Sequence, residues 1–317
     1  MNFLPKEIII VVGYGWVGQA NALTLSNVGY EVRYYDITEP KLRYADKYRE
    51  LYDSVTPLSY VLEKDGPNTW YLVCVSDRVS PEGEQDISSI QKAIDSLKNA
   101  QGGIILRSTV LPGHLASLNF HYYVPEFLHK KKAVEECMMP QYFIVGSRNV
   151  INRQPSFFKV WQQRATKTFY GTPEEASYLK YLSNIWNALR VAFVNEFGNA
   201  MAYPVNQEKL ADIEKVIDFF FERKSYLRYG KSFGGHCLPK DTRAFFAWHK
   251  KQSKDMSFIE GICKSNDSHQ IIEKKYPHLP EWFSEWVRPQ ISGWVAFRAL
   301  RSSVRRNLIK FFKKALK

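Results

Sequence analysis

The sequence predicts an α/β protein in which a doubly wound parallel sheet precedes an α-helical domain. Two observations lead to this class. Over the first half of the chain, short apolar runs alternate with helix-like segments, which is typical of βαβ units. From Pro173 onward, long segments with helical periodicity replace this alternation. We therefore expect a sheet domain at residues 1–170, a helical domain at 171–275 and a terminal segment at 276–317.

The sheet domain should begin with a buried strand at residues 6–12, whose sequence is KEIIIVV. A helix with apolar residues at helical spacing follows at 19–29 and stops at Gly29. A second helix is expected at 87–100. The remaining strands are expected at 30–36, 69–76, 102–110, 121–127 and 141–147.

One long helix is expected from Pro173 to Met201. Thr172 suits the N-cap position and proline suits the first helical position. Glu174 and Glu175 complement the positive end of the helix dipole. Further helical segments are expected at 207–222 and 240–275.

The bulk composition is that of a soluble globular protein, since 45% of the 317 residues are hydrophobic and 24% are charged. The N-terminus shows no secretory signal, and no apolar run approaches the ~20 residues needed to cross a bilayer. Scattered cysteines without CxxC spacing argue against a disulfide framework and a zinc site. We therefore expect a cytoplasmic protein that holds no metal, with reduced thiols at Cys74, Cys137, Cys237 and Cys263.

The net charge of +12 is concentrated near the C-terminus, where the stretch from Val295 onward carries eight basic residues and no acid. Its apolar residues recur at helical spacing, which predicts a basic amphipathic helix. Such a helix fits an anionic membrane surface, with Trp282, Trp286 and Trp294 at the headgroup level. The alternative is a helix that docks on its own protein. Nucleic-acid binding is the weaker expectation, because no stacking platform accompanies the charges.

A glycine motif, Gly13-x-Gly15-x-x-Gly18, directly follows the first expected strand. Gly13 allows a tight turn, Gly15 lets the backbone approach a pyrophosphate, and Gly18 lets the following helix pack closely. Asp36 ends the second strand 18 residues after Gly18, where it can accept hydrogen bonds from a ribose diol and repel a 2′-phosphate. A Rossmann-like domain that binds NAD is therefore predicted. The alternative is a glycine turn that binds nothing.

Cys237 lies in the stretch FGGHCLPKD, just after two glycines and close to Lys240. A neighbouring cation or a helix N-terminus lowers a thiol pKa and favours the nucleophilic thiolate. Beside a dinucleotide site, such a thiolate suits capture of an aldehyde as a thiohemiacetal, followed by a second oxidation to a thioester. Taken alone, a buried and inert thiol is the competing interpretation.

Several motifs in order make the chain resemble the UDP-glucose/GDP-mannose dehydrogenase family, the NAD-dependent four-electron oxidases of nucleotide sugars. The resemblance runs from about residue 8 to about residue 270. The motifs that carry it are GYGWVG, CVSDRVSPEGEQDIS, STVLPG, VPEFLHKKKAV, YLKYLSNIWNALRVAFVNE, FGGHCLPKD and NDSHQ.

The resemblance implies a role for each matching residue. Cys237 would be the nucleophile, and Lys180, assisted by Asn184, would stabilise the oxyanion. Asp241 and Thr109 would position water, and Glu126 would assist proton transfer and substrate binding. Further substrate contacts would come from Phe127, Leu128, Phe233, Gly234 and Lys240, and further NAD contacts from Trp16, Val17, Lys41, Ser76 and Thr109. The resemblance also implies a homodimer formed through the long helix and UDP-glucose as the substrate, oxidised to the uronate.

The chain departs from the family pattern at several places. Lys130 stands where the family has a second glutamate, and Lys231 and Ser232 stand in its glycine-rich loop. Only 47 residues follow Gln270. They are too few for the family's further domain of ~100 residues, so we expect the half of the substrate pocket that this domain forms to be lacking or supplied by another chain.

Two other functions remain open at this point. One is a non-catalytic descendant that binds NAD or a nucleotide sugar and acts through its basic tail at a membrane or partner. The other is a two-electron β-hydroxyacid dehydrogenase, which has a similar plan and a Lys-x-x-x-Asn helix motif.

Overall fold

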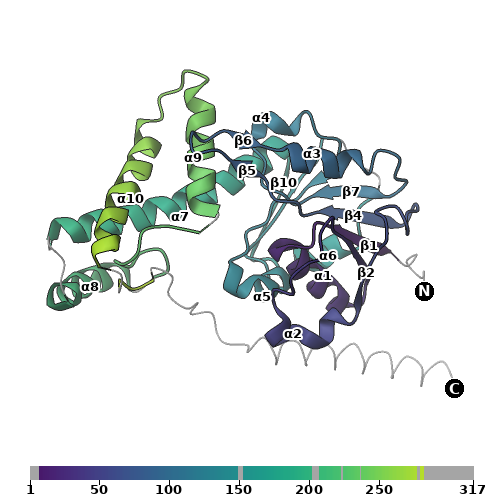
Figure 1. Ribbon diagram of the computed structural model, residues 1–317, viewed down its shortest axis with the longest axis horizontal. Coiled ribbons are helices and arrows are strands. Elements are labelled where there is room, and N and C mark those ends of the chain that lie inside the picture. Colours follow the sequence, from purple (N-terminus) through teal and green to yellow (C-terminus); the bar gives the residue numbers. More distant parts are fainter. Residues whose placement is uncertain are drawn as a thin grey trace. The chain divides into compact units, whose positions relative to one another are not determined.

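The computed structural model describes residues 7–148, 153–201, 207–222, 224–235, 237–276 and 279–281 (Figure 1). These residues form two compact units. Among the described residues, unit 1 comprises 7–77, 87–148 and 153–177, and unit 2 comprises 78–86 together with those from 178 to 281. The boundary at 177/178 lies inside a helix. The expected tail helix at 295–317 and the tryptophans before it lie outside the described residues.

Unit 1 is built on one eight-stranded sheet with the order β10-β9-β8-β7-β4-β1-β2-β3. Neighbouring strands run parallel except β8 and β9, which pair antiparallel. The strands are β1 (Ile8–Val12), β2 (Glu31–Tyr35), β3 (Val55–Pro57), β4 (Thr69–Val73), β7 (Gly103–Leu106), β8 (Tyr122–Tyr123), β9 (Tyr142–Gly146) and β10 (Lys167–Gly171). The predicted doubly wound sheet is confirmed.

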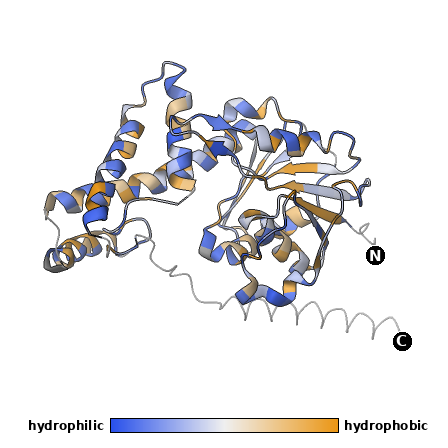
Figure 2. Cartoon of the chain, viewed as in Figure 1, coloured by the Kyte–Doolittle hydropathy of each residue, from blue (hydrophilic) through white to orange (hydrophobic). Residues whose placement is uncertain are grey.

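The helices of unit 1 cover the two faces of this sheet (Figure 1). One face shares a buried cluster with α1, α5 and α6, to which Leu23, Trp70 and Phe158 contribute. The central strand β1 consists of isoleucine and valine alone and has the hydrophobic colour in Figure 2, as is typical of a strand that is buried on both faces. The helical elements are α1 (Trp16–Val28), α2 (Ala45–Tyr52), α3 (Ser88–Asp95), α4 (Pro112–Leu115), η1 (Lys130–Lys132), α5 (Ala133–Met138) and α6 (Phe157–Arg164).

Two helix ends lie where the sequence predicts them, namely the C-terminal end of α1 and the N-terminal end of α7. Gly29 ends α1 in the left-handed conformation, with φ of 107°. At the start of α7 (Pro173–Met201), the Glu175 N–H donates to the Thr172 hydroxyl at 3.1 Å, and the Thr172 N–H donates to the Glu175 carboxylate at 2.8 Å. This reciprocal pair is a capping box. The predicted N-cap is therefore confirmed.

Unit 2 contains the part of α7 from Tyr178 onward, α8 (Gln207–Phe221), α9 (Cys237–Lys250), α10 (Ser257–Lys275) and a hairpin of β5 (Arg78–Val79) with β6 (Gln85–Asp86). The single helical segment expected at 240–275 is wrong, because it is two helices. Ser253 has a positive φ of 58° between them, and the Asp255 carboxylate accepts the Ser257 N–H at 2.9 Å where the second helix begins. Within the described residues, no helix is long and apolar enough to cross a membrane.

Candidate active site

The glycine motif of unit 1 forms a turn that only glycine can make. Gly13 follows β1 with φ of 90°. A Cβ on Gly18 would lie 2.0 Å from the Gly13 carbonyl oxygen, so the helix can approach the strand only without a side chain there. A Cβ on Gly15 would meet no atom within 4 Å, which leaves open space at the start of α1. A bare turn, open space and a helix N-terminus together fit a pyrophosphate.

Asp36 lies just beyond the end of β2 and is tied to this turn. One carboxylate oxygen accepts the Tyr14 N–H at 2.6 Å, and the other accepts the Thr38 N–H and hydroxyl at 3.0 and 3.1 Å. The carboxylate is therefore held beside the glycine turn, where a ribose diol would lie in a dinucleotide. The residues present fit NAD.

The other expected NAD contacts of unit 1 surround the same helix end or follow its strands. The Trp16 ring packs edge-on against Tyr44 at 5.4 Å and lies under the Lys130 ammonium at 4.3 Å. Val17 is the second residue of α1 and half-buried. Lys41 is exposed, and its carbonyl accepts the Gln19 side-chain amide at 2.9 Å. Ser76, after β4, is exposed, and Thr109, after β7, is half-buried.

Glu126, which is half-buried, lies in a polar cluster in unit 1 that the sequence did not indicate. Its carboxylate forms an ion pair with Arg107, which is 5% exposed. The Asn21 amide, on α1, donates to the same carboxylate at 3.1 Å. The Arg107 guanidinium also lies 4.7 Å from the Trp161 ring centroid. The ion pair and the amide hydrogen bond together fix the position of the Glu126 carboxylate.

The two residues after Glu126 leave the polar cluster. The Phe127 ring contacts Tyr142 edge-on, with centroids 5.4 Å apart. Leu128 packs, partly buried, against the main hydrophobic cluster of unit 1. Both were expected to line the sugar site, and that expectation stays a prediction.

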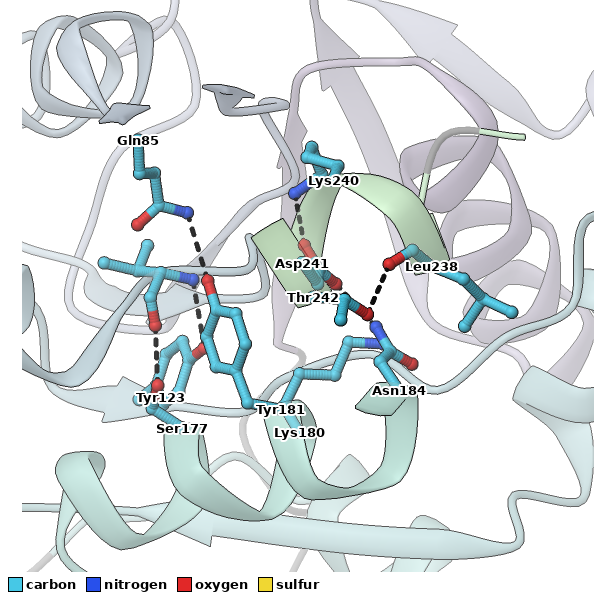
Figure 3. Close-up of polar contacts among 11 residues, drawn as sticks. Gln85, Tyr123, Ser177, Lys180, Tyr181, Asn184, Leu238, Lys240, Asp241 and Thr242 are labelled. Carbon is cyan, nitrogen blue, oxygen red and sulfur yellow. Dashed lines mark hydrogen bonds and ion pairs between the residues drawn. The ribbon is translucent and has the colours of Figure 1, made fainter. Parts of the chain in front are cut away.

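Unit 2 holds a continuous row of polar side chains between α7 and α9 (Figure 3). The Lys180 ammonium contacts the Asn184 carbonyl oxygen at 3.4 Å, as their i,i+4 spacing predicts. The Asn184 amide donates to one oxygen of Asp241 at 2.5 Å, and the Lys240 ammonium pairs with the other at 2.6 Å. Lys180, Asn184 and Asp241 are at most 6% exposed. Because these groups are buried, the electrostatic interactions between them are stronger than they would be in water.

Cys237 is the first residue of α9 and is exposed. Gly235, just before it, has φ of 74°, and a Cβ on either Gly234 or Gly235 would meet no atom within 4 Å. Asp241 lies one helical turn after Cys237, so the thiol and the polar row share a face of α9. Phe233, expected at the substrate, has a side chain that is 2% exposed and packs with Val191 and Leu238, and its role at the substrate stays a prediction.

The remaining cysteines differ from Cys237 in their surroundings. Burial raises the pKa of Cys74 to about 12 and the pKa of Cys137 and of Cys263 to about 11. At neutral pH these three thiols therefore hold little of the nucleophilic thiolate form. In the described part of the chain, no group of three or more His, Cys, Asp or Glu side chains is placed to hold a metal ion.

Residues 174–268 match the family model described as "UDP-glucose/GDP-mannose dehydrogenase family, central domain". A UDP-glucose 6-dehydrogenase of Campylobacter jejuni is 27% identical over 303 residues, which cover 86% of this chain and 76% of that protein. A GDP-mannose 6-dehydrogenase of Pseudomonas aeruginosa is 25% identical over 305 residues, which cover 83% and 69%.

Among solved structures, a UDP-glucose dehydrogenase of the hyperthermophilic archaeon Pyrobaculum islandicum has a TM-score of 0.73 at 21% identity, covering 87% of this chain and 73% of that one. Identity at that level shows a shared fold. The central part of the chain thus matches the UDP-glucose/GDP-mannose dehydrogenase family model, and the chain as a whole is similar in sequence to 6-dehydrogenases of UDP-glucose and GDP-mannose.

Proposed function

We propose that this protein oxidises the C6 alcohol of a nucleotide sugar, UDP-glucose, to the uronate with two molecules of NAD. The observation that carries the proposal is the buried row formed by Lys180 and Asn184 on α7 and Asp241 on α9, with the exposed Cys237 one helical turn before Asp241. The relatives in sequence are 6-dehydrogenases of UDP-glucose and GDP-mannose, which supports a sugar nucleotide as the substrate class.

The cofactor fits the glycine turn and Asp36 of unit 1. When bound, NAD accepts one hydride in each of the two oxidations. The first oxidation converts the alcohol to an aldehyde. The Cys237 sulfur then forms a bond to the aldehyde carbon, and the carbonyl oxygen takes up a proton to give a thiohemiacetal.

The second two-electron oxidation converts the thiohemiacetal to a thioester on Cys237. Water then attacks the acyl carbon, the carbon–sulfur bond breaks, and the products are the uronate and the free thiol. Each step conserves atoms, and the four electrons leave as two hydrides.

Lys180 and Asn184 are proposed to stabilise the negative oxygen that develops when Cys237 adds to the aldehyde. Asn184 is suited to this because its amide is fixed by Asp241 before the reaction begins, and a preorganised donor costs no reorientation. Asp241, held between Asn184 and Lys240, is proposed to orient the attacking water. Lys240, Phe233 and Gly234 are proposed to contact the substrate.

Unit 1 is proposed to contribute Thr109 to NAD and water, and Glu126 to proton transfer and sugar binding. The Arg107 ion pair and the Asn21 amide hold the carboxylate of Glu126 in place, which suits accepting a hydrogen bond from a sugar hydroxyl. Phe127 and Leu128 are proposed as sugar contacts.

A homodimer through α7 is also proposed. The exposed side of this helix in unit 2 carries large apolar residues at spacings of four and seven, which gives one stripe. Exposure of such residues marks a surface that another chain can cover. The stripe consists of Leu182, Trp186, Phe193 and Phe197. A monomeric mass in light scattering would remove this part of the proposal.

Membrane association through residues 295–317 stays a sequence-based prediction. Liposome flotation of the chain with and without these residues tests it.

Product analysis tests the function. The purified chain is incubated with NAD and, separately, UDP-glucose, GDP-mannose and other UDP-hexoses, and the products are identified by mass spectrometry. The proposal expects a nucleotide-linked uronate from UDP-glucose. NAD binding without any oxidised product would support the non-catalytic alternative instead.

A further inference from the structure

The segment at residues 230–233, shortly before Cys237, has no regular secondary structure, but six of its backbone N–H and C=O groups are hydrogen-bonded by side chains of unit 2. The Asn195 side chain accepts the Gly230 N–H at 3.0 Å and donates to the Lys231 carbonyl at 3.0 Å. The Asn266 side chain accepts the Phe233 N–H at 2.8 Å and donates to the Phe233 carbonyl at 3.1 Å. Both asparagines are at most 2% exposed.

Two further side chains on α10 complete this set. The His269 ring donates from Nε2 to the Gly230 carbonyl at 2.6 Å. The Glu273 carboxylate accepts the Ser232 N–H at 3.0 Å and also the Ser232 hydroxyl. We refer to Asn195, Asn266, His269 and Glu273 as the clamp.

The clamp contacts residues that have no role in the proposed reaction. Ser232 departs from the family's glycine-rich loop, and its hydroxyl is bound by Glu273. Lys231, the other departure, pairs with Glu281 at 3.1 Å. The motif NDSHQ at 266–270 supplies two of the clamp residues, Asn266 and His269.

The tautomer of His269 follows from its neighbours. Its Nε2 must donate, because it faces a carbonyl oxygen. Its Nδ1 therefore accepts from the Asn199 amide at 2.9 Å, whose own carbonyl oxygen accepts the Tyr229 hydroxyl at 2.9 Å. Among the described residues, the titratable groups near the ring include Glu273 and Tyr229, whose ring packs edge-on against His269 with centroids 5.6 Å apart. A neutral glutamine can make the same two hydrogen bonds, whereas alanine makes neither.

We propose that the clamp holds residues 230–233 in one conformation before substrate arrives, and that its four side chains thereby position Cys237 for reaction. The inference rests on the proposed function for its catalytic consequence. Its physical basis is independent of that function. Removing one partner leaves a buried backbone N–H or C=O unsatisfied, which costs more than the hydrogen bond itself contributed. The clamp residues are positioning residues, since they act through the loop.

The test uses the full chain with Asn266→Ala, His269→Ala and His269→Gln, and with Asp267→Ala as the control. Asp267 neighbours Asn266 on α10 but forms an exposed ion pair with Arg243, which contributes little. Amide hydrogen exchange of residues 229–235 reports the loop, the rate of Cys237 alkylation by iodoacetamide reports the thiol, and KM and kcat with UDP-glucose and NAD report catalysis.

We expect Asn266→Ala and His269→Ala to speed exchange in the loop about tenfold and to lower kcat/KM about tenfold. His269→Gln should restore both to within about twofold of the wild type, and Asp267→Ala should change neither. Unchanged exchange in both alanine variants would overturn the clamp. Faster exchange with unchanged kcat/KM and unchanged alkylation would show a purely structural role.

Two controls keep the outcome interpretable. If the wild-type chain does not oxidise UDP-glucose, the proposed function fails, and the clamp is judged by exchange and by the alkylation rate of Cys237. If Asn266→Ala does not fold, Ser232→Gly removes only the hydroxyl contact with Glu273, and an unchanged loop exchange in that variant and in His269→Ala would overturn the proposal.

Discussion

The Asn184 amide donates a 2.5 Å hydrogen bond to the Asp241 carboxylate, and both side chains are buried between α7 and α9. This contact joins two segments that are 57 residues apart in sequence. Because the Lys240 ammonium holds the other oxygen of Asp241, the carboxylate cannot rotate without breaking one of the two contacts. The amide of Asn184 therefore has a fixed direction, which is what a donor to a developing oxyanion requires.

Replacing Asn184 by alanine should lower kcat by about 10²-fold, because it removes one preorganised donor. Steady-state rates of NADH formation with UDP-glucose measure the effect. Asn187→Ala is the matched control on the same helix. The Asn187 side chain accepts a hydrogen bond from Arg190 and is not part of the polar row described above. Equal rates for the two variants would argue against an oxyanion role for Asn184.

Alkylation should distinguish Cys237 from the other three cysteines. All four lie in the described part of the chain and none is in a disulfide there. Burial raises the pKa of Cys74, Cys137 and Cys263, so at pH about 8 they hold almost no thiolate. Peptide mapping after brief exposure to iodoacetamide should find the label on Cys237. Earlier labelling of Cys263 than of Cys237 would speak against the nucleophile assignment.

Replacing Asp36 by asparagine should weaken NAD binding about tenfold. It should also reduce the difference between the affinities for NAD and NADP. The amide oxygen can still accept the Tyr14 N–H, whereas the amide NH2 cannot accept the Thr38 N–H, and the charge that repels a 2′-phosphate is lost. Calorimetric titration with NAD and NADP measures both affinities. Asp46→Asn, at an exposed position on α2, is the control. Unchanged affinities in the Asp36 variant would mean that the ribose lies elsewhere.

His269 should make the stability of unit 2 depend on pH. Burial lowers the pKa of His269 below its ordinary value of 6.5, so the folded state favours the neutral ring that the clamp needs. The unfolded chain binds the proton more tightly, and the free energy of unfolding should therefore fall as pH drops below about 6.5. Urea unfolding followed between pH about 7.5 and about 5.5 measures this, and His269→Gln should make the dependence shallower. An equally steep dependence in the glutamine variant would assign it to another group.

Much of the fold could be predicted because its signals are local. The glycine turn, the helix that ends at Gly29 and the Thr172 cap each depend on residues close together in sequence. The break between α9 and α10 could not be predicted in this way. Helical periodicity continues across it, and the turn at Ser253 has a positive φ without a glycine to mark it.

In the candidate site, too, contacts between residues close in sequence could be predicted, and contacts between distant residues could not. The i,i+4 relation of Lys180 to Asn184 follows from helical geometry. Arg107 carried no signal, because its pairing with Glu126 joins the ends of two neighbouring strands. Asn195 and Glu273 were likewise invisible, since their partners are backbone groups of a distant loop. Side chains that act through tertiary contacts need the structure to be found.

The number of NADH molecules formed per UDP-glucose consumed tests the central claim most directly. Four-electron oxidation through Cys237 predicts two NADH per sugar for the wild-type chain, with the uronate as product. Cys237→Ala should abolish this stoichiometry, because no thioester can form. One NADH per sugar in the wild type, or two in the Cys237→Ala variant, would contradict the account.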